Sequence, residues 1–296
     1  MTVLTVGETM ALLDPLGDGD LELGMPFQLR IAGAESNFAV SLARLGVPVR
    51  WMSRLGRDRF GDLVLRTLVE EGVDVSLVLR DDARTGLFVK WRHEGRTSVT
   101  YYRAGSAASR LAPDDLPDAA FDGIRLVHLT GITMAISDSA CELVVDVARR
   151  AKERGAIVLF DPNFRPTLPD TPEAAVDRQR TVLPFVDWYL CGEEEARLLW
   201  GDSEAIEARA VVRVGERGAV VDGELVPPLR VTDVVDEIGA GDAFAAGFAY
   251  GLLEGWEPRD CARAGNVLAA YALRGTGDWE TAPRLADIAD ELRPGD

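Results

Sequence analysis

Residues 234–247 read VVDEIGAGDAFAAG, and this stretch decides the fold that we expect. A strand predicted over Val234–Asp236 ends here, a glycine-rich loop follows, and small apolar residues begin a helix predicted over Ala243–Leu253. Gly239 and Gly241 allow the backbone to approach a ligand without a Cβ clash. The free N–H groups and the positive dipole end of the helix then favour an anion, which we expect to be a phosphate.

Asp242 lies at the same helix start. A carboxylate cannot bind the phosphate itself, but it can accept a proton from a hydroxyl group held against the phosphate. The loop alone leaves two alternatives open, a simple helix cap or a dinucleotide-binding loop. The dinucleotide loop fits less well, because Phe244 takes the place of the third glycine and the loop lies near the C-terminus.

The rest of the chain alternates predicted strands and helices. Strands are expected over residues 1–7, 47–55, 127–131, 156–161, 186–190, 210–214 and 219–221, and helices over 34–45, 60–72, 139–154, 193–200 and 259–273. This alternation predicts an α/β fold with a parallel sheet covered on both faces.

Two segments, about residues 8–32 and 85–104, contain hairpin strands and turn residues instead. We expect them to meet in a small β-sheet, a lid over the carboxyl ends of the main strands, where ligands bind. Residues 1–296 are therefore predicted to form a single α/β domain with a β lid.

The composition excludes several functions. The chain has 32 basic and 49 acidic residues and a net charge of −17, which disfavours binding to nucleic acid or to a membrane surface. Neither of the two lysines, Lys90 and Lys152, follows a glycine-rich loop, so a Walker A nucleotide site is excluded. His93 and His128 are the only histidines, which leaves little room for a multi-histidine metal site or a Ser-His hydrolase.

The cysteines and the N-terminal residues indicate in which cellular compartment the protein resides. Cys141, Cys191 and Cys261 lie far apart and include no C-x-x-C pair, as expected for buried cysteines in a reducing cytoplasm. The first residues lack the basic segment of a signal peptide, and no 18-residue apolar stretch could span a bilayer. We therefore expect a cytoplasmic protein.

Residues 236–244 resemble the C-terminal signature D-x-x-G-A-G-D-x-F of the ribokinase-like (PfkB) sugar kinases. Further matches follow in the family's order: Gly33 and Asn37 before AVSLARLG (39–46), LGRDRFG (55–61), FDPNFR (160–165) and VGERGA (214–219). The resemblance implies a three-layer ribokinase-like fold with a mainly parallel central sheet and a β lid. It also implies transfer of the γ-phosphoryl group of ATP to a sugar hydroxyl, with Mg²⁺.

The resemblance also implies roles for individual residues. Asp242 would be the base, and the backbone of Gly239, Ala240, Gly241 and Asp242 would stabilise the charge that develops on the transferred group. The residues implied to bind the nucleotide are Asn163, Arg165, Arg213, Gly215, Gly218, Gly239, Gly241 and Asn266.

Glu195, in CGEEE (191–195), matches the acid of the family's N-x-x-E motif, which helps to hold Mg²⁺ directly or through water. The chain departs from the motif, because Gly192 stands where the asparagine is expected. Glu195 could alternatively belong only to the acidic first turn of a helix, which the helix dipole favours. Glu237 and Ile238 are a second departure, in place of the family's commoner Thr-Thr pair.

Two arginines favour an acidic sugar. Tyr101 and Arg103 are expected to point the same way from the lid hairpin, where Arg103 could bind a carboxylate through two N–H groups. Arg165 is a second cation near this edge. The pattern Y-x-R-x-x-S-A-A (101–108) and Arg165 resemble the 2-keto-3-deoxygluconate kinases of the family. The resemblance implies substrate contacts from Gly33, Asn37, Phe88, Tyr101, Arg103, Arg165, Asp242 and Asp278, with Phe88 in place of a phenol.

Several alternatives stay open at this point. Arg103 could be an exposed hairpin residue, and Arg165 could bind only the nucleotide. The sugar could be fructose, another hexose, ribose or a nucleoside, or the chain could be an inactive sugar-binding regulator. A nicotinamide dehydrogenase would need G-x-G-x-x-G after the first strand, which residues 6–10 do not supply. Exposed lid edges also predict a homodimer formed through the lids.

Overall fold

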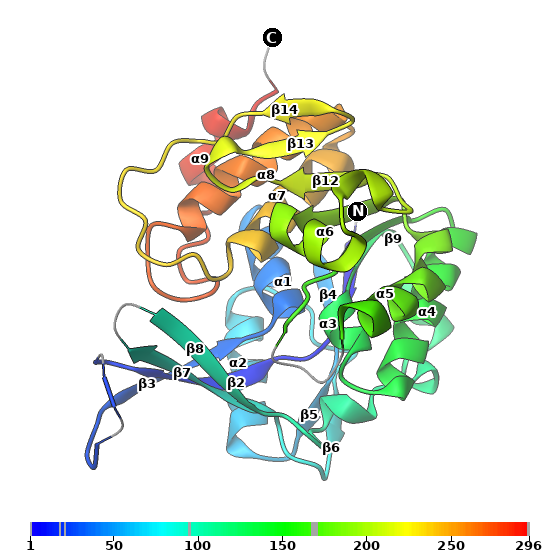
Figure 1. Cartoon of the computed structure of the whole chain (residues 1–296). Helices are drawn as coiled ribbons and strands as arrows, with labels where there is room; N and C mark the ends of the chain where they lie inside the picture. Colours follow the sequence, from blue (N-terminus) through cyan, green and yellow to red (C-terminus); the bar gives the residue numbers. More distant parts are fainter. Residues whose placement is uncertain (1, 18, 21, 94–95, 167–170, 295–296) are drawn as a thin grey trace.

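The computed structural model describes residues 2–17, 19–20, 22–93, 96–166 and 171–294. A large sheet crosses the molecule with helices on both of its faces, and a smaller sheet projects from one end (Figure 1). The large sheet has the order β14-β13-β12-β11-β10-β9-β1-β4. Its pairs from β4 to β12 are parallel, and β13 and β14 add an antiparallel edge. The expected ribokinase-like α/β architecture, a mainly parallel sheet with a separate small sheet, is confirmed.

The strands of the large sheet are β1 (Thr2–Val6), β4 (Val49–Met52), β9 (Ile124–Thr130), β10 (Ile157–Asp161), β11 (Trp188–Gly192), β12 (Ala210–Arg213), β13 (Ala219–Val221) and β14 (Glu224–Val226). The α-helices are α1 (Ala34–Arg44), α2 (Arg59–Glu70), α3 (Gly131–Met134), α4 (Asp138–Glu153), α5 (Pro172–Val182), α6 (Glu193–Trp200), α7 (Ala240–Glu254), α8 (Pro258–Ala272) and α9 (Leu285–Leu292).

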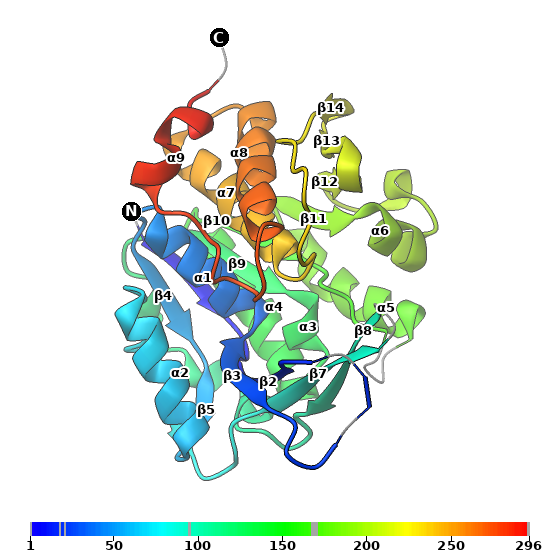
Figure 2. The same ribbon diagram turned by 90° about the vertical axis from the view of Figure 1, so that its left-hand side faces the viewer.

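Buried side chains of the central strands alternate between two apolar layers. Leu159 of β10 packs into the layer that holds residues of α1, α7 and α8, whereas Val158 and Phe160 pack into the layer on the α4 side. Figure 2 shows α7 and α8 side by side. The two-residue period of a strand produces this alternation, and it explains why the strands read as nearly continuous apolar runs.

Helix α7 is buried along almost its whole length. A Cβ atom on Gly247 would lie 2.4 Å from the carbonyl oxygen of Ala264, so α7 and α8 approach each other too closely for a larger residue there. Glycine at position 247 is therefore required by helix packing.

The small sheet contains β2 (Met10–Pro15), β3 (Phe27–Ala32), β7 (Leu87–His93) and β8 (Arg96–Tyr102), in the order β3-β2-β7-β8. Leu12 pairs with Phe88, and Phe88 pairs with Tyr101, so one face carries a small apolar cluster. The two predicted lid segments do form one sheet. The tip of the predicted second hairpin, residues 94–95, lies outside the described residues.

The strand predicted over Val234–Asp236 is wrong. These residues pair with no strand among the described residues, and the side chains of Val234 and Val235 are 52% and 55% exposed. The amide of Val235 instead donates to the carbonyl oxygen of Leu273. Two prolines, Pro227 and Pro228, follow β14 and supply no amide donors, so the chain leaves the sheet there.

The strand predicted over residues 47–55 is two strands in different sheets. β4 joins the large sheet, whereas β5 (Arg54–Gly56) pairs with β6 (Leu79–Asp81) in a two-stranded sheet. Within the part of the chain that the structure describes, no helix has the length and apolar character needed to cross a bilayer.

Candidate active site

A cavity of ≈ 580 Å³ lies between the lid and the first turn of α7. Phe88, Lys90 and Tyr101 line it from the lid, and Gly239, Gly241 and Asp242 line it from the opposite side. Other lining residues that the sequence analysis named are Gly33, Asn37, Asn163, Arg165, Glu195, Arg213, Glu237, Ile238 and Asp278. The carboxyl ends of the parallel strands and the lid therefore enclose one site, as the alternation of elements predicted.

Asp242 is buried at the start of α7, between two asparagine side chains. Its Oδ2 atom accepts a hydrogen bond from Nδ2 of Asn37 in α1 (2.8 Å), and its Oδ1 atom accepts one from Nδ2 of Asn163 after β10 (3.2 Å). Burial raises the pKa of Asp242 to about 7, although the hydrogen bond from Asn37 acts in the opposite direction. A carboxylate with this pKa can exchange a proton near neutral pH.

Gly239 caps α7 with φ of +83°, in the left-handed region that favours glycine. A Cβ atom on Gly239 would lie 2.0 Å from the carbonyl oxygen of Asp278, so this position excludes every other residue sterically. Gly241 is less constrained, because its nearest contact, the guanidinium of Arg213, would be 3.5 Å from a Cβ atom. The backbone of Asp278 and the tip of α7 are thus packed directly together.

Arg213, at the end of β12, forms ion pairs with two carboxylates. Its Nη1 atom lies 2.8 Å from Oδ2 of Asp161, and its Nη2 atom lies 3.4 Å from Oε2 of Glu195. Nη1 also donates to the carbonyl oxygen of Gly241 (3.3 Å). Arg213 therefore links β10, β12 and α6 to the start of α7.

Both carboxylate oxygens of Glu195 accept hydrogen bonds. Oε1 accepts from the amide of Phe164 and Oε2 from the amide of Gly192, each at 2.9 Å, so Glu195 caps the start of α6. Among the described residues no group of three His, Cys, Asp or Glu side chains forms a metal site. Glu195 faces the cavity, but its oxygens already have protein partners.

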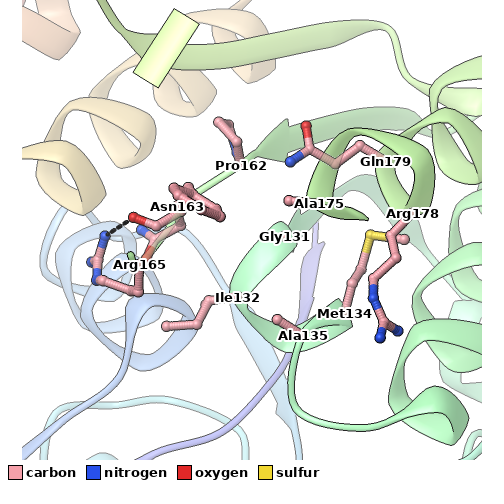
Figure 3. Close-up of a pocket in the computed structure, with 11 residues that line it drawn as sticks. Gly131, Ile132, Met134, Ala135, Pro162, Asn163, Arg165, Ala175, Arg178 and Gln179 are labelled. Atoms are coloured by element: carbon pink, nitrogen blue, oxygen red, sulfur yellow. Dashed lines mark hydrogen bonds between the residues drawn. The ribbon is translucent and has the colours of Figure 1, made fainter. Parts of the chain in front are cut away.

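Arg165 differs from Arg213 in its partners. Its Nη1 atom donates to the carbonyl oxygen of Phe164 (3.3 Å), and no carboxylate among the described residues pairs with it. Figure 3 shows Arg165 beside Ile132 and Asn163, with the dashed bond to the main chain. The positive charge of Arg165 favours the ionised form of Asp242. Arg165 thus supplies a positive charge to the cavity that the protein does not neutralise by direct pairing.

Arg103 is buried, so it is not the exposed hairpin residue that the sequence left possible. Its Nη2 atom lies 2.6 Å from Oε2 of Glu8, whose Oε1 atom accepts a hydrogen bond from Ser106 (2.6 Å). Nε and Nη1 of Arg103 are buried, and within the described residues they have no acceptor. The guanidinium lies 5.6 Å from the centre of the ring of Tyr101, which lines the cavity, but Arg103 itself is not among the lining residues, so its substrate contact stays a prediction.

Asp278 forms a buried ion pair with Lys90, with 2.7 Å between Oδ1 and Nζ. The sequence analysis did not name Lys90 as a site residue. The sequence did contain a signal for Lys90. Phe88 and Lys90 are two residues apart on β7 and therefore share the face toward the cavity. Ile132, which also lines the cavity, carried no comparable signal.

Three residues with an implied nucleotide role, Gly215, Gly218 and Asn266, do not line this cavity. Nδ2 of Asn266 donates to the carbonyl oxygens of Val226 and Pro227, both at 3.0 Å. A Cβ atom on Gly218 would lie 2.1 Å from the carbonyl oxygen of Val226, so the chain after β14 passes against both residues. Their nucleotide role stays a prediction.

The profile of the pfkB family carbohydrate kinases matches residues 2–284. The chain belongs to this family. It is therefore a carbohydrate kinase, and the resemblance that its motifs carried is confirmed. As a pfkB kinase it has Asp242 at the family's glycine-rich signature, and the structure places that carboxylate in the cavity beneath the lid.

The alignments with several relatives cover nearly the whole length of this pfkB kinase. It is 35% identical to 2-dehydro-3-deoxygluconokinase of Bacillus subtilis (strain 168), over 99% of this chain and 95% of that protein. It is 33% identical to 2-dehydro-3-deoxygalactonokinase of Haloferax volcanii, over 99% and 97%. The crystal structure of fructokinase with bound ATP from Xylella fastidiosa superposes with a TM-score of 0.86, at 26% identity and 98% coverage of each chain.

Proposed function

We propose that this pfkB kinase transfers the γ-phosphoryl group of ATP to a hydroxyl group of a 2-keto-3-deoxy sugar acid, with 2-keto-3-deoxygluconate as the first candidate. One observation carries the proposal. Asp242, a buried carboxylate at the tip of α7, shares a cavity with Arg165, a cation that pairs with no carboxylate among the described residues. A base and an unpaired cation in one cavity suit the transfer of an anionic group to an alcohol.

Each group has a defined task in this reaction. Asp242 accepts the proton of the attacking hydroxyl, and Asn37 and Asn163 hold its carboxylate in place. The backbone N–H groups of Gly241 and Asp242, for which the structure shows no acceptor among the described residues, stabilise the negative charge on the transferred phosphoryl group, whereas that of Ala240 donates to the carbonyl oxygen of Glu237 (3.4 Å). The close packing of Asp278 against Gly239 keeps these donors in position.

The nucleotide and the metal are supported to different degrees. The fructokinase structure contains ATP, which supports ATP as the phosphoryl donor here. Mg²⁺ in kinases is commonly held by phosphate oxygens, water and one or two carboxylates, and when bound it neutralises phosphate charge. Each oxygen of Glu195 accepts one backbone hydrogen bond and keeps a second lone pair, so this residue fits a metal position reached directly or through water.

The unused donors of Arg103 favour an acidic sugar. A buried N–H group without an acceptor is unfavourable, and Arg103 has two such donors near Tyr101. A carboxylate on the sugar could accept from both and form charge-assisted hydrogen bonds. The named activities of the two relatives agree with this substrate class. Fructose is the second candidate, supported by the fructokinase likeness.

A substrate screen tests the proposed function directly. ADP formation is measured by a coupled assay with 2-keto-3-deoxygluconate, its galacto isomer, gluconate, fructose and ribose. We expect the highest kcat/KM with one of the two keto-deoxy acids. A higher kcat/KM for fructose or ribose than for both acids would contradict the sugar-acid assignment, and no turnover with any sugar would indicate an inactive binding protein.

Arg103→Ala is expected to raise KM for 2-keto-3-deoxygluconate by about 10–100-fold and KM for fructose by only a few-fold. The range follows from about 1.5–3 kcal/mol for hydrogen bonds to charged groups. Steady-state kinetics with both sugars measure it. Arg110→Ala, which removes a more exposed arginine paired with Asp81, is the control. Equal changes for both sugars would show that Arg103 has only a structural role.

The pH profile of kcat/KM reports the ionisation of the catalytic base. Since Asp242 must be ionised to accept a proton and its pKa is raised to about 7, we expect kcat/KM to rise with pH through about 7 and to be lost below it. The profile is measured at saturating ATP in buffers of constant ionic strength. The same inflection in the residual activity of Asp242→Asn would assign it to another group.

A further inference from the structure

The loop between α8 and α9, residues 273–284, contacts the lid at two strands. Figures 1 and 2 show this orange-red loop descending toward the lid. At β7, Lys90 pairs with Asp278. At β3, Nη1 of Arg30 lies 2.7 Å from Oε1 of Glu280, and Nε1 of Trp279 donates to the carbonyl oxygen of Ile31 (3.1 Å).

Asp278 therefore has two neighbours of different kinds. Its main chain packs against Gly239 at the tip of α7, and its carboxylate is held by an ammonium group from the lid. Both side chains of the ion pair line the cavity, and Lys90 is only 1% exposed. The pair thus connects the position of β7 to the part of the loop that touches the catalytic helix.

Stability alone does not explain this pair. Burying two charges costs solvation energy, and a packed apolar pair of similar size is often at least as stable. Without Lys90, the Asp278 carboxylate would add an unneutralised negative charge to a cavity that also contains Asp242 and Glu237. That charge would repel an anionic sugar and a nucleotide phosphate.

We propose that Lys90 is a positioning residue for the sugar: it fixes the Asp278 carboxylate as an acceptor for a sugar hydroxyl group and offsets its charge. Lys90 acts through Asp278, so that Asp278 is correctly placed only when β7 lies in the position seen here. The inference rests on the proposed function, because it requires a sugar in this cavity.

A double-mutant cycle with Lys90→Met, Asp278→Asn and the double variant tests the inference. Each single substitution is expected to raise KM for the sugar by about 10-fold or more and to change kcat by only a few-fold. In the Asp278→Asn background, adding Lys90→Met is expected to change KM by less than about 3-fold, because the group through which Lys90 acts is already altered. Lys90→Arg, which keeps the charge, is expected to retain most of the affinity.

The chain supplies a matched control in its only other lysine. Lys152 also forms an ion pair, with Asp187, but it lies on α4 away from the cavity, so Lys152→Met is expected to leave KM unchanged. Thermal unfolding midpoints of all variants verify folding. If Lys90→Met does not fold, the cycle uses Lys90→Arg and Lys90→Gln, and equal KM values for these two would overturn the inference.

The outcomes separate the two proposals. Additive effects of Lys90→Met and Asp278→Asn on KM, with whichever sugar is phosphorylated, would overturn only the role of Lys90. A fall in kcat without a rise in KM would overturn it too. Absence of turnover by the wild type with every sugar would contradict the proposed function, and this inference with it.

Discussion

Asp242→Asn is expected to lower kcat by about 10²–10⁴-fold while the KM values for ATP and the sugar change only a few-fold. Asparagine keeps the shape of the side chain and can accept from one of the two flanking amides, and Asn163, whose Oδ1 atom has no partner among the described residues, can turn to accept from the new amide group; asparagine cannot, however, accept the hydroxyl proton. The loss should therefore appear in turnover rather than in binding. Single-turnover kinetics measure the chemical step separately from product release.

Asp138→Asn is the control for this substitution. Asp138 is also an acidic residue in the first turn of a helix, α4, but its side chain is exposed and pairs with Arg178. We expect normal turnover in this variant. Near-normal turnover in Asp242→Asn would rule out the base, whereas an equal loss in both variants would point to a general effect of helix-start charge.

Gly239→Ala is expected to lower kcat by about 10²-fold or more. The new Cβ atom would lie 2.0 Å from the carbonyl oxygen of Asp278, so the loop or the start of α7 must move. Displacements of about 1 Å in a catalytic arrangement can cost this much. Steady-state kinetics and the unfolding midpoint should both be measured, because the kinetic loss is expected to exceed what a fall in the folded fraction explains.

Gly255→Ala is the control that distinguishes the effect of a steric clash from the effect of backbone strain. Gly255 caps the other end of α7 with φ of +77°, and a Cβ atom there would meet nothing within 4 Å. Strain alone, about 1–2 kcal/mol, should lower the stability of this variant and leave kcat unchanged. Equal kcat in Gly239→Ala and the wild type would show that the packing of Asp278 on Gly239 does not matter for catalysis.

Most of the fold could be predicted, because a parallel sheet imposes a strong local pattern. Buried strands read as apolar runs, and helices such as α6 begin and end at residues with clear signals. The strand predictions failed where the local preference of the residues for a strand disagrees with the surrounding structure. Val234 and Val235 favour a strand, but Pro227 and Pro228 take the chain out of the sheet after β14, so the two valines lie in a loop. The short edge strand β14 was also missed: unlike the equally short and wholly apolar β13, it begins with an exposed glutamate and gives no apolar run.

The site could be predicted only in part. Asp242, Asn37 and Asp278 lie far apart in the sequence, and the family resemblance rather than any local pattern brought them together; the structure places all three at one cavity. The partners that hold these residues were not foreseen. Lys90 and Asp278 are 188 positions apart, and Glu8 meets Arg103 from the end of the first strand. Long-range ion pairs leave no periodicity in the chain, so one sequence alone does not reveal them.

The tight contact of Gly247 with α8 has a consequence for how such an enzyme can diversify. A helix that has no space to tilt or slide against its neighbour cannot adapt to a differently shaped acceptor molecule. New preferences are then expected among lining residues outside α7, such as Phe88, Val99 and Tyr101 of the lid, because Asp242 is held by Asn37 and Asn163 and not by the lid. Laboratory evolution toward another acceptor should accumulate changes in the lid strands and leave the helix pair intact.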